Sequence, residues 1–182
     1  MTFRLAVIGG GNMGAALVGG LLGAGWAAAD LAIVEVLPAR VEELRTMFPG
    51  VALSTDIPAC EAALVAVKPY DVPAACTAAV AAGAKRLLSI AAGVSIATLQ
   101  QAAGAGVAVV RSMPNTPALV GKGAAGIAGG QSATAADLDW ADSILGSVGT
   151  VVRVPEAQLD AVRSEEHTSE LQSHHDLVCR LL

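Results

Sequence analysis

The sequence has no excess of basic residues. Its 11 lysines and arginines stand against 16 aspartates and glutamates, and the formal net charge at pH 7 is −5. Nucleic acids and anionic membrane surfaces attract proteins through clustered lysine and arginine, and no such cluster occurs along the sequence. We therefore expect neither nucleic acid nor a membrane as a partner.

Long hydrophobic runs are missing as well. Every apolar run is interrupted by glycine, proline or a charged residue before the roughly 20 residues that a membrane-spanning helix needs. Residues 1–5 lack the charged and apolar regions of a secretory signal peptide. These absences predict a cytoplasmic protein.

Cysteine is scarce, with three residues in the sequence. Cys60, Cys76 and Cys179 lie far apart and show neither the spacing of a metal site nor that of a redox motif. An odd and scattered set is typical of proteins from a reducing cytosol. We interpret these cysteines as small buried apolar side chains.

Hydrophobic residues, by contrast, make up 54% of the 182 positions, which is enough for the core of one domain. Strands that are apolar throughout, with helices between them, are typical of a parallel sheet covered on both faces. The pattern predicts an α/β fold with a doubly wound, Rossmann-type parallel sheet. The expected strands are 4–8, 31–36, 62–67, 86–90 and 107–112, and the expected helices are 13–22, 38–47, 72–82 and 96–103. Helix stops with positive φ are expected at Gly23, Gly50, Gly83 and Gly104.

The stretch 5–14 has the pattern of a buried strand that runs into a glycine turn and then a helix. Gly9, Gly11 and Gly14 match G-x-G-x-x-G, in which the first glycine permits a tight turn and the second lets the backbone approach a pyrophosphate. The third allows the helix to pack closely on the strand. Unpaired N–H groups at the helix N-terminus stabilise an anion without a basic side chain. The motif predicts a dinucleotide site.

Glu35 ends the second predicted strand, about 20 residues after Gly14, where an acidic side chain can accept hydrogen bonds from an adenosine ribose. A 2′-phosphate would meet like charge there, although Arg40 could compensate by reaching across. The alternative interpretation is a solvated glutamate at a strand end. We expect NADPH or NADH as cofactor, with NADH favoured.

Two further segments lie at predicted strand ends, the edge where ligands bind in open α/β sheets. In Ala-Val-Lys-Pro, residues 66–69, Pro69 ends the strand and biases Lys68 to an extended conformation; Lys68 could equally be an ordinary surface lysine. In Ser-Ile-Ala-Ala-Gly, residues 89–93, small side chains would let a flat ring approach the backbone.

A fourth segment, residues 110–121, has the pattern of a strand that ends in two prolines within four residues. Two fixed φ angles predict a rigid loop that presents Asn115 and Thr116 in a defined orientation. A purely structural crossover loop is the alternative interpretation.

Together and in this order, the four motifs resemble the N-terminal domain of pyrroline-5-carboxylate reductase. They are Gly-Gly-Gly-Asn-Met-Gly, Ala-Val-Lys-Pro, Ser-Ile-Ala-Ala-Gly-Val and Arg-Ser-Met-Pro-Asn-Thr-Pro-Ala-Leu-Val-Gly, and the resemblance covers residues 3 to about 162. It implies an NAD(P)H-dependent enzyme of proline biosynthesis. In such an enzyme hydride passes from the nicotinamide to the imine of 1-pyrroline-5-carboxylate, which gives L-proline.

The resemblance also implies roles for single residues. Asn115 would lie near the reacting ring, while the adenine-side asparagine of the family has no obvious counterpart, and Asp56 is the nearest candidate. The predicted cofactor-binding residues are Ile8, Gly9, Gly10, Gly11, Asn12 and Met13 at the pyrophosphate, Gly14 as the last glycine of the motif, Glu35 at the ribose, Ala66, Val67, Lys68 and Pro69 on the ribose and nicotinamide side, and Ala91 and Ala92 as the nicotinamide wall.

Residues 163–182 do not continue the resemblance. The stretch Arg-Ser-Glu-Glu-His-Thr-Ser-Glu-Leu-Gln-Ser resembles a translated sequencing-library adapter. We expect a dinucleotide-binding domain over 1–162, including the start of a linker helix, and a foreign tail over 163–182 that is disordered or loosely helical. This origin also explains His167, His174, His175 and Cys179 without a metal cluster, and we expect no metal.

In the family, a helical C-terminal domain supplies the substrate pocket, the remaining catalytic residues and the homo-oligomer contacts. We expect that domain to be absent and the chain as written to be inactive. A related reductase, either a β-hydroxyacid dehydrogenase or a deazaflavin-dependent NADP reductase, is an alternative, but it should lack Met-Pro-Asn-Thr-Pro. A non-catalytic dinucleotide-binding module is another, and it would need neither Lys68 nor Asn115.

Overall fold

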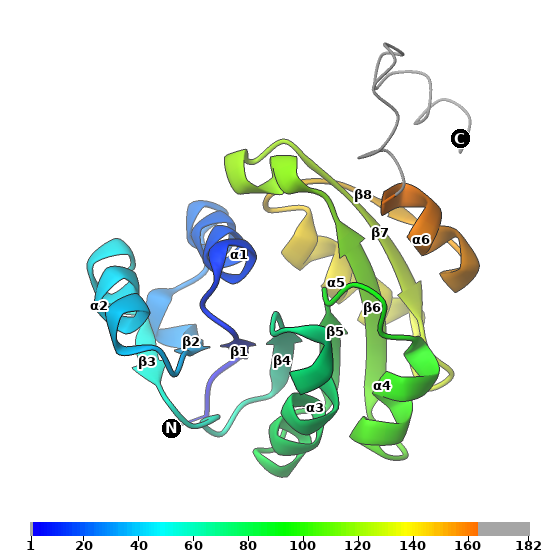
Figure 1. The fold of residues 1–182 in the computed structure, drawn as a ribbon, viewed down its shortest axis with the longest axis horizontal. Helices are drawn as coiled ribbons and strands as arrows, with labels where there is room; N and C mark the ends of the chain where they lie inside the picture. The colour runs from blue at the N-terminus through cyan, green and yellow to red at the C-terminus, as the bar shows by residue number, and fades with distance from the viewer. Residues whose placement is uncertain (1, 164–182) are drawn as a thin grey trace.

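The computed structural model of this chain describes residues 2–163 and shows one twisted sheet with helices on both faces (Figure 1). The strands are β1 (Leu5–Ile8), β2 (Leu31–Val34), β3 (Ala52–Ser54), β4 (Ala62–Val65), β5 (Arg86–Ser89), β6 (Ala108–Pro114), β7 (Gly123–Gly129) and β8 (Gly149–Arg153). The helices are α1 (Asn12–Gly23), α2 (Pro38–Met47), α3 (Val72–Ala81), α4 (Ile96–Ala103), α5 (Ala135–Leu145) and α6 (Glu156–Arg163). Short 3₁₀ turns are η1 (Ala28–Asp30), η2 (Pro69–Asp71) and η3 (Thr116–Val120).

The strands follow the order β3-β2-β1-β4-β5-β6-β7-β8, and all neighbouring pairs are parallel except β6 with β7. The chain winds outward from β1 to β3, returns, and continues from β4 in the other direction. The order therefore reverses between β1 and β4, where an open α/β sheet forms its ligand crevice. This confirms the predicted doubly wound fold.

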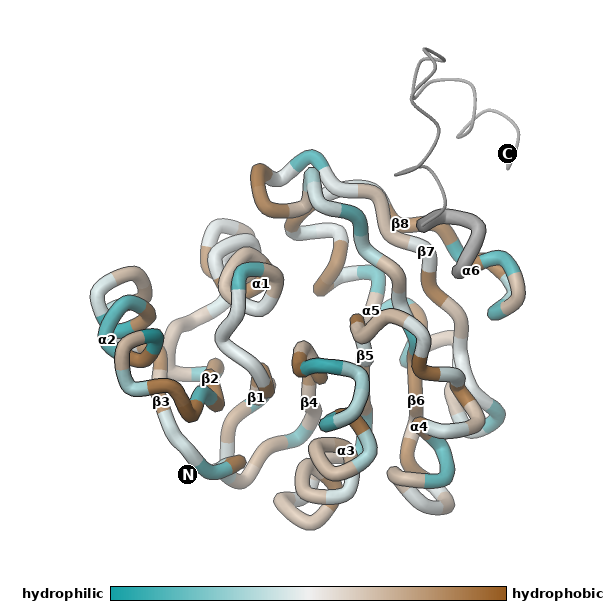
Figure 2. Tube along the Cα trace, viewed as in Figure 1, coloured by the Kyte–Doolittle hydropathy of each residue, from teal (hydrophilic) through white to brown (hydrophobic). Residues whose placement is uncertain are grey.

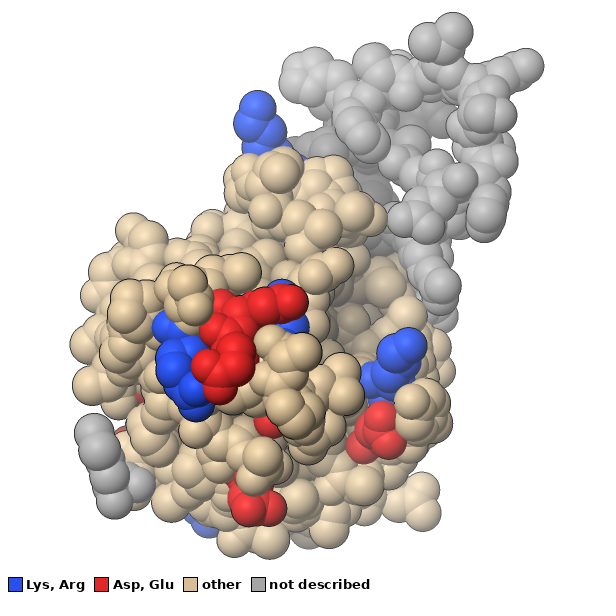
Figure 3. Space-filling model, turned by 60° about the vertical axis from the view of Figure 1, so that its left-hand side comes forward, with Lys and Arg blue, Asp and Glu red and all other residues tan. Residues whose placement is uncertain are grey.

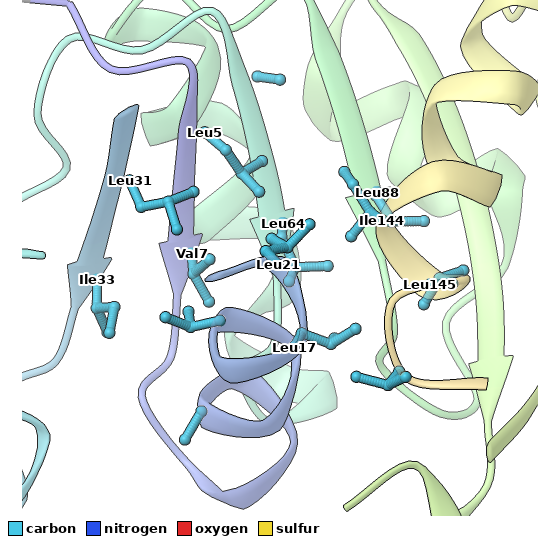
Figure 4. Packing of buried hydrophobic residues seen from close by; sticks show 14 of the residues in the cluster. Leu5, Val7, Leu17, Leu21, Leu31, Ile33, Leu64, Leu88, Ile144 and Leu145 are labelled. Atoms are coloured by element: carbon cyan, nitrogen blue, oxygen red, sulfur yellow. The ribbon is translucent and has the colours of Figure 1, made fainter. Parts of the chain in front are cut away.

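Alternating side chains of the central strands supply two hydrophobic cores. Leu5 and Val7 of β1 face a core with α1 and α5, to which α2 contributes Leu44, whereas Ala6 and Ile8 face the core with α3 and α4. Figure 4 shows the first core, with leucines of α1 packed between the strands and α5. Figure 2 shows hydrophobic colours along the strands and hydrophilic segments on α2. Burial on both faces explains why these strands are continuous apolar runs.

All the predicted strands and helices are present, and the bounds of α2 and α4 agree residue for residue. Strands β2 and β4 end two residues earlier than expected, at Val34 and Val65. Three of the four glycine predictions hold, with positive φ at Gly50, Gly83 and Gly104. Gly23 was predicted wrongly, because it is the last residue of α1 and the positive φ falls at Gly25.

Cys60 and Cys76 are buried and free, as predicted. Burial raises the pKa of the Cys60 thiol and raises that of Cys76 to about 11, so both stay protonated at neutral pH. Cys179, the three histidines and residues 164–182 of the predicted tail lie outside the described residues. Within residues 2–163, no helix is long and apolar enough to cross a membrane.

The fold requires α1 to pack closely on the glycine turn, and Gly14 is where this constraint acts. A Cβ at Gly14 would overlap the carbonyl oxygen of Gly9, whereas a Cβ at Gly23 in the same helix meets nothing within 4 Å. Gly14→Ala should lower the free energy of unfolding by about 1–3 kcal/mol through overpacking. Gly23→Ala, the matched control, should leave it unchanged or raise it by up to about 1 kcal/mol, since alanine favours a helix. Urea denaturation measures both, and equal effects at the two positions would contradict this packing.

Candidate functional site

The register of the parallel strands brings four of the predicted segments to one edge of the sheet. Ile8 is paired with Val34 and Val65, and Val65 with Ser89, so the residues that follow these strands emerge side by side. The pairing extends one residue further, because Gly9 donates to the carbonyl of Val34 and Ala66 to that of Ile8, at 2.9 and 2.8 Å. The glycine loop and the segments after β2, β4 and β5 therefore share the carboxyl edge.

The three motif glycines are required for different reasons. Gly9 has φ +105°, and a Cβ there would lie 2.5 Å from the carbonyl oxygen of Ala66. Gly14 is needed for the packing of α1, as described above. Gly11 has an ordinary φ of −63°, and a Cβ there would meet nothing within 4 Å. The first and third glycines are thus explained by the fold, while the second faces open space.

The N-terminus of α1 begins directly after this open position. Gly11 is the N-cap residue and has no side chain to accept a hydrogen bond from the first turn, which also contains no acidic residue. The first N–H groups of a helix have no acceptor within the helix itself. A bound anion would find amide donors and the positive end of the helix dipole here, so the loop fits a pyrophosphate.

Glu35 and Arg40 flank the glycine loop on its β2 side. One Glu35 carboxylate oxygen accepts from Gly10 N at 3.1 Å, and the other accepts from Val36 N and Leu37 N at 2.8 and 3.0 Å. Arg40 Nε donates to the Gly10 carbonyl at 2.7 Å, which the sequence did not indicate. Both charged groups therefore position the turn. The Glu35 oxygen that takes one N–H keeps capacity to accept from a ligand hydroxyl.

Charges on the neighbouring helix α2 are balanced. Arg40 pairs with Glu43 at 2.6 Å, and Arg45 pairs with Glu42. Figure 3, in which the α2 side comes forward, shows basic and acidic groups next to each other rather than a field of one sign. Within residues 2–163, no group of three or more histidine, cysteine or acidic side chains could hold a metal ion.

The segments after β4 and β5 form the rest of the edge. Lys68 is exposed and has the predicted extended conformation before Pro69, which starts η2, although β4 itself ends earlier, at Val65. After β5, the buried Ser89 hydroxyl accepts from Ala91 N at 3.4 Å and holds the backbone in a turn. Ala91 is buried, and Ala92 packs against a small separate cluster. In this turn, residues 90–93, Ile90 is followed by two alanines and a glycine, so the rest of the turn has only small side chains.

The Met-Pro-Asn-Thr-Pro segment continues β6 beyond the edge and turns back into β7 as a hairpin. Asn115 closes the base of the hairpin, since its Oδ1 accepts from Ala124 N at 2.9 Å and its own N–H donates to the Ala124 carbonyl at 3.1 Å. The tip, η3, packs against α1 through the buried Ala118. Asn115 thus has a structural role in the hairpin, whereas the sequence alone left a structural and a functional role of this loop both open.

A groove of about 590 Å³ lies behind α1, between α2 and η3. Its floor is the small-residue face of α1, and its walls include Arg40 and the exposed Met47, Leu119 and Val120. Asn12 is the one predicted cofactor-binding residue among its lining. Most of the predicted cofactor-binding residues therefore lie at the carboxyl edge of the sheet and do not line this groove.

Comparisons with known proteins agree with this geometry. A family model described as "NADP oxidoreductase coenzyme F420-dependent" matches residues 4–93, which contain the glycine loop and the segments after β2, β4 and β5. Pyrroline-5-carboxylate reductase of Mycobacterium tuberculosis is 39% identical over 170 residues, which cover 87% of this chain and 57% of that relative. The chain thus spans a little over half the length of this curated relative.

Solved structures of reductases with related names are also similar to this chain. A pyrroline-5-carboxylate reductase from Coxiella burnetii matches with a TM-score of 0.79 and 26% identity over 89% of this chain and 63% of that one. The pyrroline carboxylate reductase of Plasmodium falciparum, solved with NADP bound, matches in fold with a TM-score of 0.72 and 23% identity over 87% of this chain and 60% of that one. By sequence and fold together, the chain is similar to pyrroline-5-carboxylate reductases.

Proposed function

We propose that this domain binds NADH or NADPH at the carboxyl edge of the sheet and that the intact protein reduces 1-pyrroline-5-carboxylate to L-proline. The observation that carries the proposal is Gly11, a motif glycine that no neighbouring residue of the fold requires, beside a helix N-terminus without an anionic cap. The relatives named for this activity support the substrate, and the P. falciparum structure with NADP supports the cofactor.

Each segment of the edge has a task in this proposal. Within residues 8–14, the backbone N–H groups at the start of α1 hold the pyrophosphate, because those of Gly9 and Gly10 already donate to Val34 and Glu35. Glu35 accepts from the adenosine ribose. Residues 66–69 lie along the ribose and nicotinamide side, and Ala91 and Ala92 form the wall for the nicotinamide ring. Asn115 holds the hairpin that rises next to this wall. The cofactor, when bound, supplies the hydride that adds to the imine carbon, while a proton resides on the ring nitrogen.

The proposal divides the chain at residue 162, with the dinucleotide-binding domain before it and the tail, 163–182, outside the functional unit. Buried, free Cys60 and Cys76 are suited to a reducing compartment, and we place the protein in the cytoplasm on that basis. The F420-dependent family model ends at residue 93, before the Met-Pro-Asn-Thr-Pro hairpin. That hairpin favours the imine reductase over the related reductases that share the glycine motif.

Gly11→Val should abolish cofactor binding without unfolding the domain. The valine side chain enters space that the chain leaves open, so the melting temperature should stay within a few degrees, but it occupies the position where a pyrophosphate must touch the backbone. Titration of the full chain with NADH and NADPH, followed by nicotinamide fluorescence, measures the loss. Gly23→Ala in the same helix is the control, and undiminished binding by Gly11→Val would remove the assignment of the loop.

The ratio of NADH to NADPH affinity should depend on Glu35 and Arg40 in opposite directions. Repulsion by the Glu35 carboxylate should weaken the binding of a 2′-phosphate by about 1 kcal/mol or more. Wild type should therefore bind NADH at least as tightly as NADPH. Glu35→Gln should shift the ratio of dissociation constants toward NADPH by roughly fivefold, and Arg40→Gln should shift it toward NADH. A distortion of the glycine turn would weaken the binding of both cofactors equally, so it would leave the ratio of their dissociation constants unchanged. Tenfold tighter NADPH binding by wild type would make Arg40 the dominant contact.

The 182-residue chain, tested by itself, should bind the cofactor but turn over 1-pyrroline-5-carboxylate poorly. The described residues form one wall of a site, and holding the imine carbon against the nicotinamide is worth on the order of 7–11 kcal/mol in favourable cases. Oxidation of NADH with the imine substrate should be at least roughly a hundredfold slower than with the intact M. tuberculosis relative. A fusion to the remaining part of that relative should restore turnover. Equal rates for the chain and the relative would show that this domain suffices.

A further inference from the structure

Glu156, the first residue of α6, joins three elements that lie far apart in the sequence. Its Oε1 accepts a hydrogen bond from the backbone N–H of Ile96 at 2.7 Å and from Arg111 Nη1 at 3.1 Å. Ile96 is the first residue of α4, and Arg111 lies on β6. One carboxylate oxygen therefore connects α6 to the start of α4 and to the sheet.

The hydrogen bond from Ile96 to Glu156 lies at the end of the turn that is proposed as the nicotinamide wall. This turn leaves β5 after Ser89 and enters α4 at Ile96, and Ala92 packs against a cluster that also contains Met113 and Leu159 of α6. Figure 1 shows α6, in orange, alongside β6 and β7, and α6 contacts both strands. The wall is thus held by β5 on one side and by the Glu156 contact on the other.

Glu156 acts on α4 from outside that helix. The helix has its own cap residue, Ser95, whose hydroxyl accepts from Thr98 N at 3.2 Å, but this hydroxyl does not serve the N–H of Ile96. The Glu156 carboxylate supplies that acceptor, and its negative charge is favoured at a helix N-terminus. Hydrogen bonds of this charge-assisted kind are stronger than those between neutral groups. The position at which α4 begins therefore depends on α6.

The Arg111 side chain makes the arrangement rigid. It is 4% exposed and pairs with the same Glu156 oxygen, so the carboxylate is held from the sheet while it holds α4. Because the Arg111 side chain is buried on β6 while Glu156 is 36% exposed, the partly buried pair ties the N-terminus of α4 to this strand. Residues 90–95 connect the end of β5 to the start of α4.

We propose that Glu156 is a positioning residue for the nicotinamide end of the cofactor. By fixing the start of α4, it sets the place of Ala91 and Ala92 against which the ring lies, while the glycine loop binds the rest of the cofactor independently. The inference rests on the proposed function, since it assigns the wall to that same site. It also makes α6 part of the cofactor site, because Glu156 acts on the site through α4.

Ligands with and without nicotinamide separate this role from general stability. NADH and NADPH reach the wall, whereas ADP-ribose carries the same adenosine and pyrophosphate but no ring. For Glu156→Ala in the full chain, NADH and NADPH should bind about tenfold more weakly, equivalent to roughly 1.4 kcal/mol. ADP-ribose should bind within about twofold of wild type, because its contacts lie at the glycine loop. Calorimetric titration gives the three dissociation constants.

Two further variants sharpen the test. Glu156→Gln keeps an oxygen acceptor at the same place but no charge, so it should restore part of the NADH affinity that Glu156→Ala loses. The fluorescence of bound NADH should return toward its wild-type value. Gln158→Ala, on an exposed position of α6, should leave all three affinities unchanged.

An equal loss for NADH and ADP-ribose in Glu156→Ala, or no loss for either, would overturn the positioning role. Failure of the glutamine variant to restore NADH binding would also overturn it, because the acceptor oxygen would then not be what holds the wall. Absence of NADH, NADPH and ADP-ribose binding by wild type would instead refute the proposed function itself.

Discussion

The structure depends on how closely three backbone segments approach one another at the glycine turn. Gly9 turns with positive φ against the carbonyl of Ala66, and Gly14 brings α1 onto the carbonyl of Gly9. A Cβ at either position would push β1, β4 and α1 apart, and the switch point of the sheet lies between these two strands. The same tight turn leaves the N-terminus of α1 uncovered, so the packing constraint and the anion site have one origin.

Parallel register then assembles the site from segments that are distant in sequence. Since each strand carries its loop to the same edge, residues after β1, β2, β4 and β5 become neighbours without any direct signal between them. The antiparallel pair of β6 and β7 departs from this rule and sends the hairpin beyond the edge and onto α1. The carboxyl edge thus consists of the loops after β1, β2, β4 and β5, and the β6–β7 hairpin extends beyond them.

Charged side chains at this edge act mainly on the backbone. Glu35 and Arg40 bind the N–H and carbonyl of the same residue, Gly10, and Glu156 binds the N–H of Ile96. Such contacts are strong because one partner is ionised, and they are directional, so they fix a turn more firmly than apolar packing does. We infer that the chain uses its few partly buried charges to hold the shape of the loops.

Local sequence determined the elements whose signals lie within them. Pro38 and Ser95 mark the starts of α2 and α4, apolar runs mark the central strands, and glycine spacing marks the turn. Strand β7, Gly-Ala-Ala-Gly-Ile-Ala-Gly, has little intrinsic strand preference and forms because β6 and β8 pair with it on either side. Likewise the partners of Glu156 lie 45 and 60 residues away, and the Gly10 carbonyl lies 30 residues from Arg40. Such contacts exist only after the sheet has brought its loops together, so the tertiary structure alone decided them.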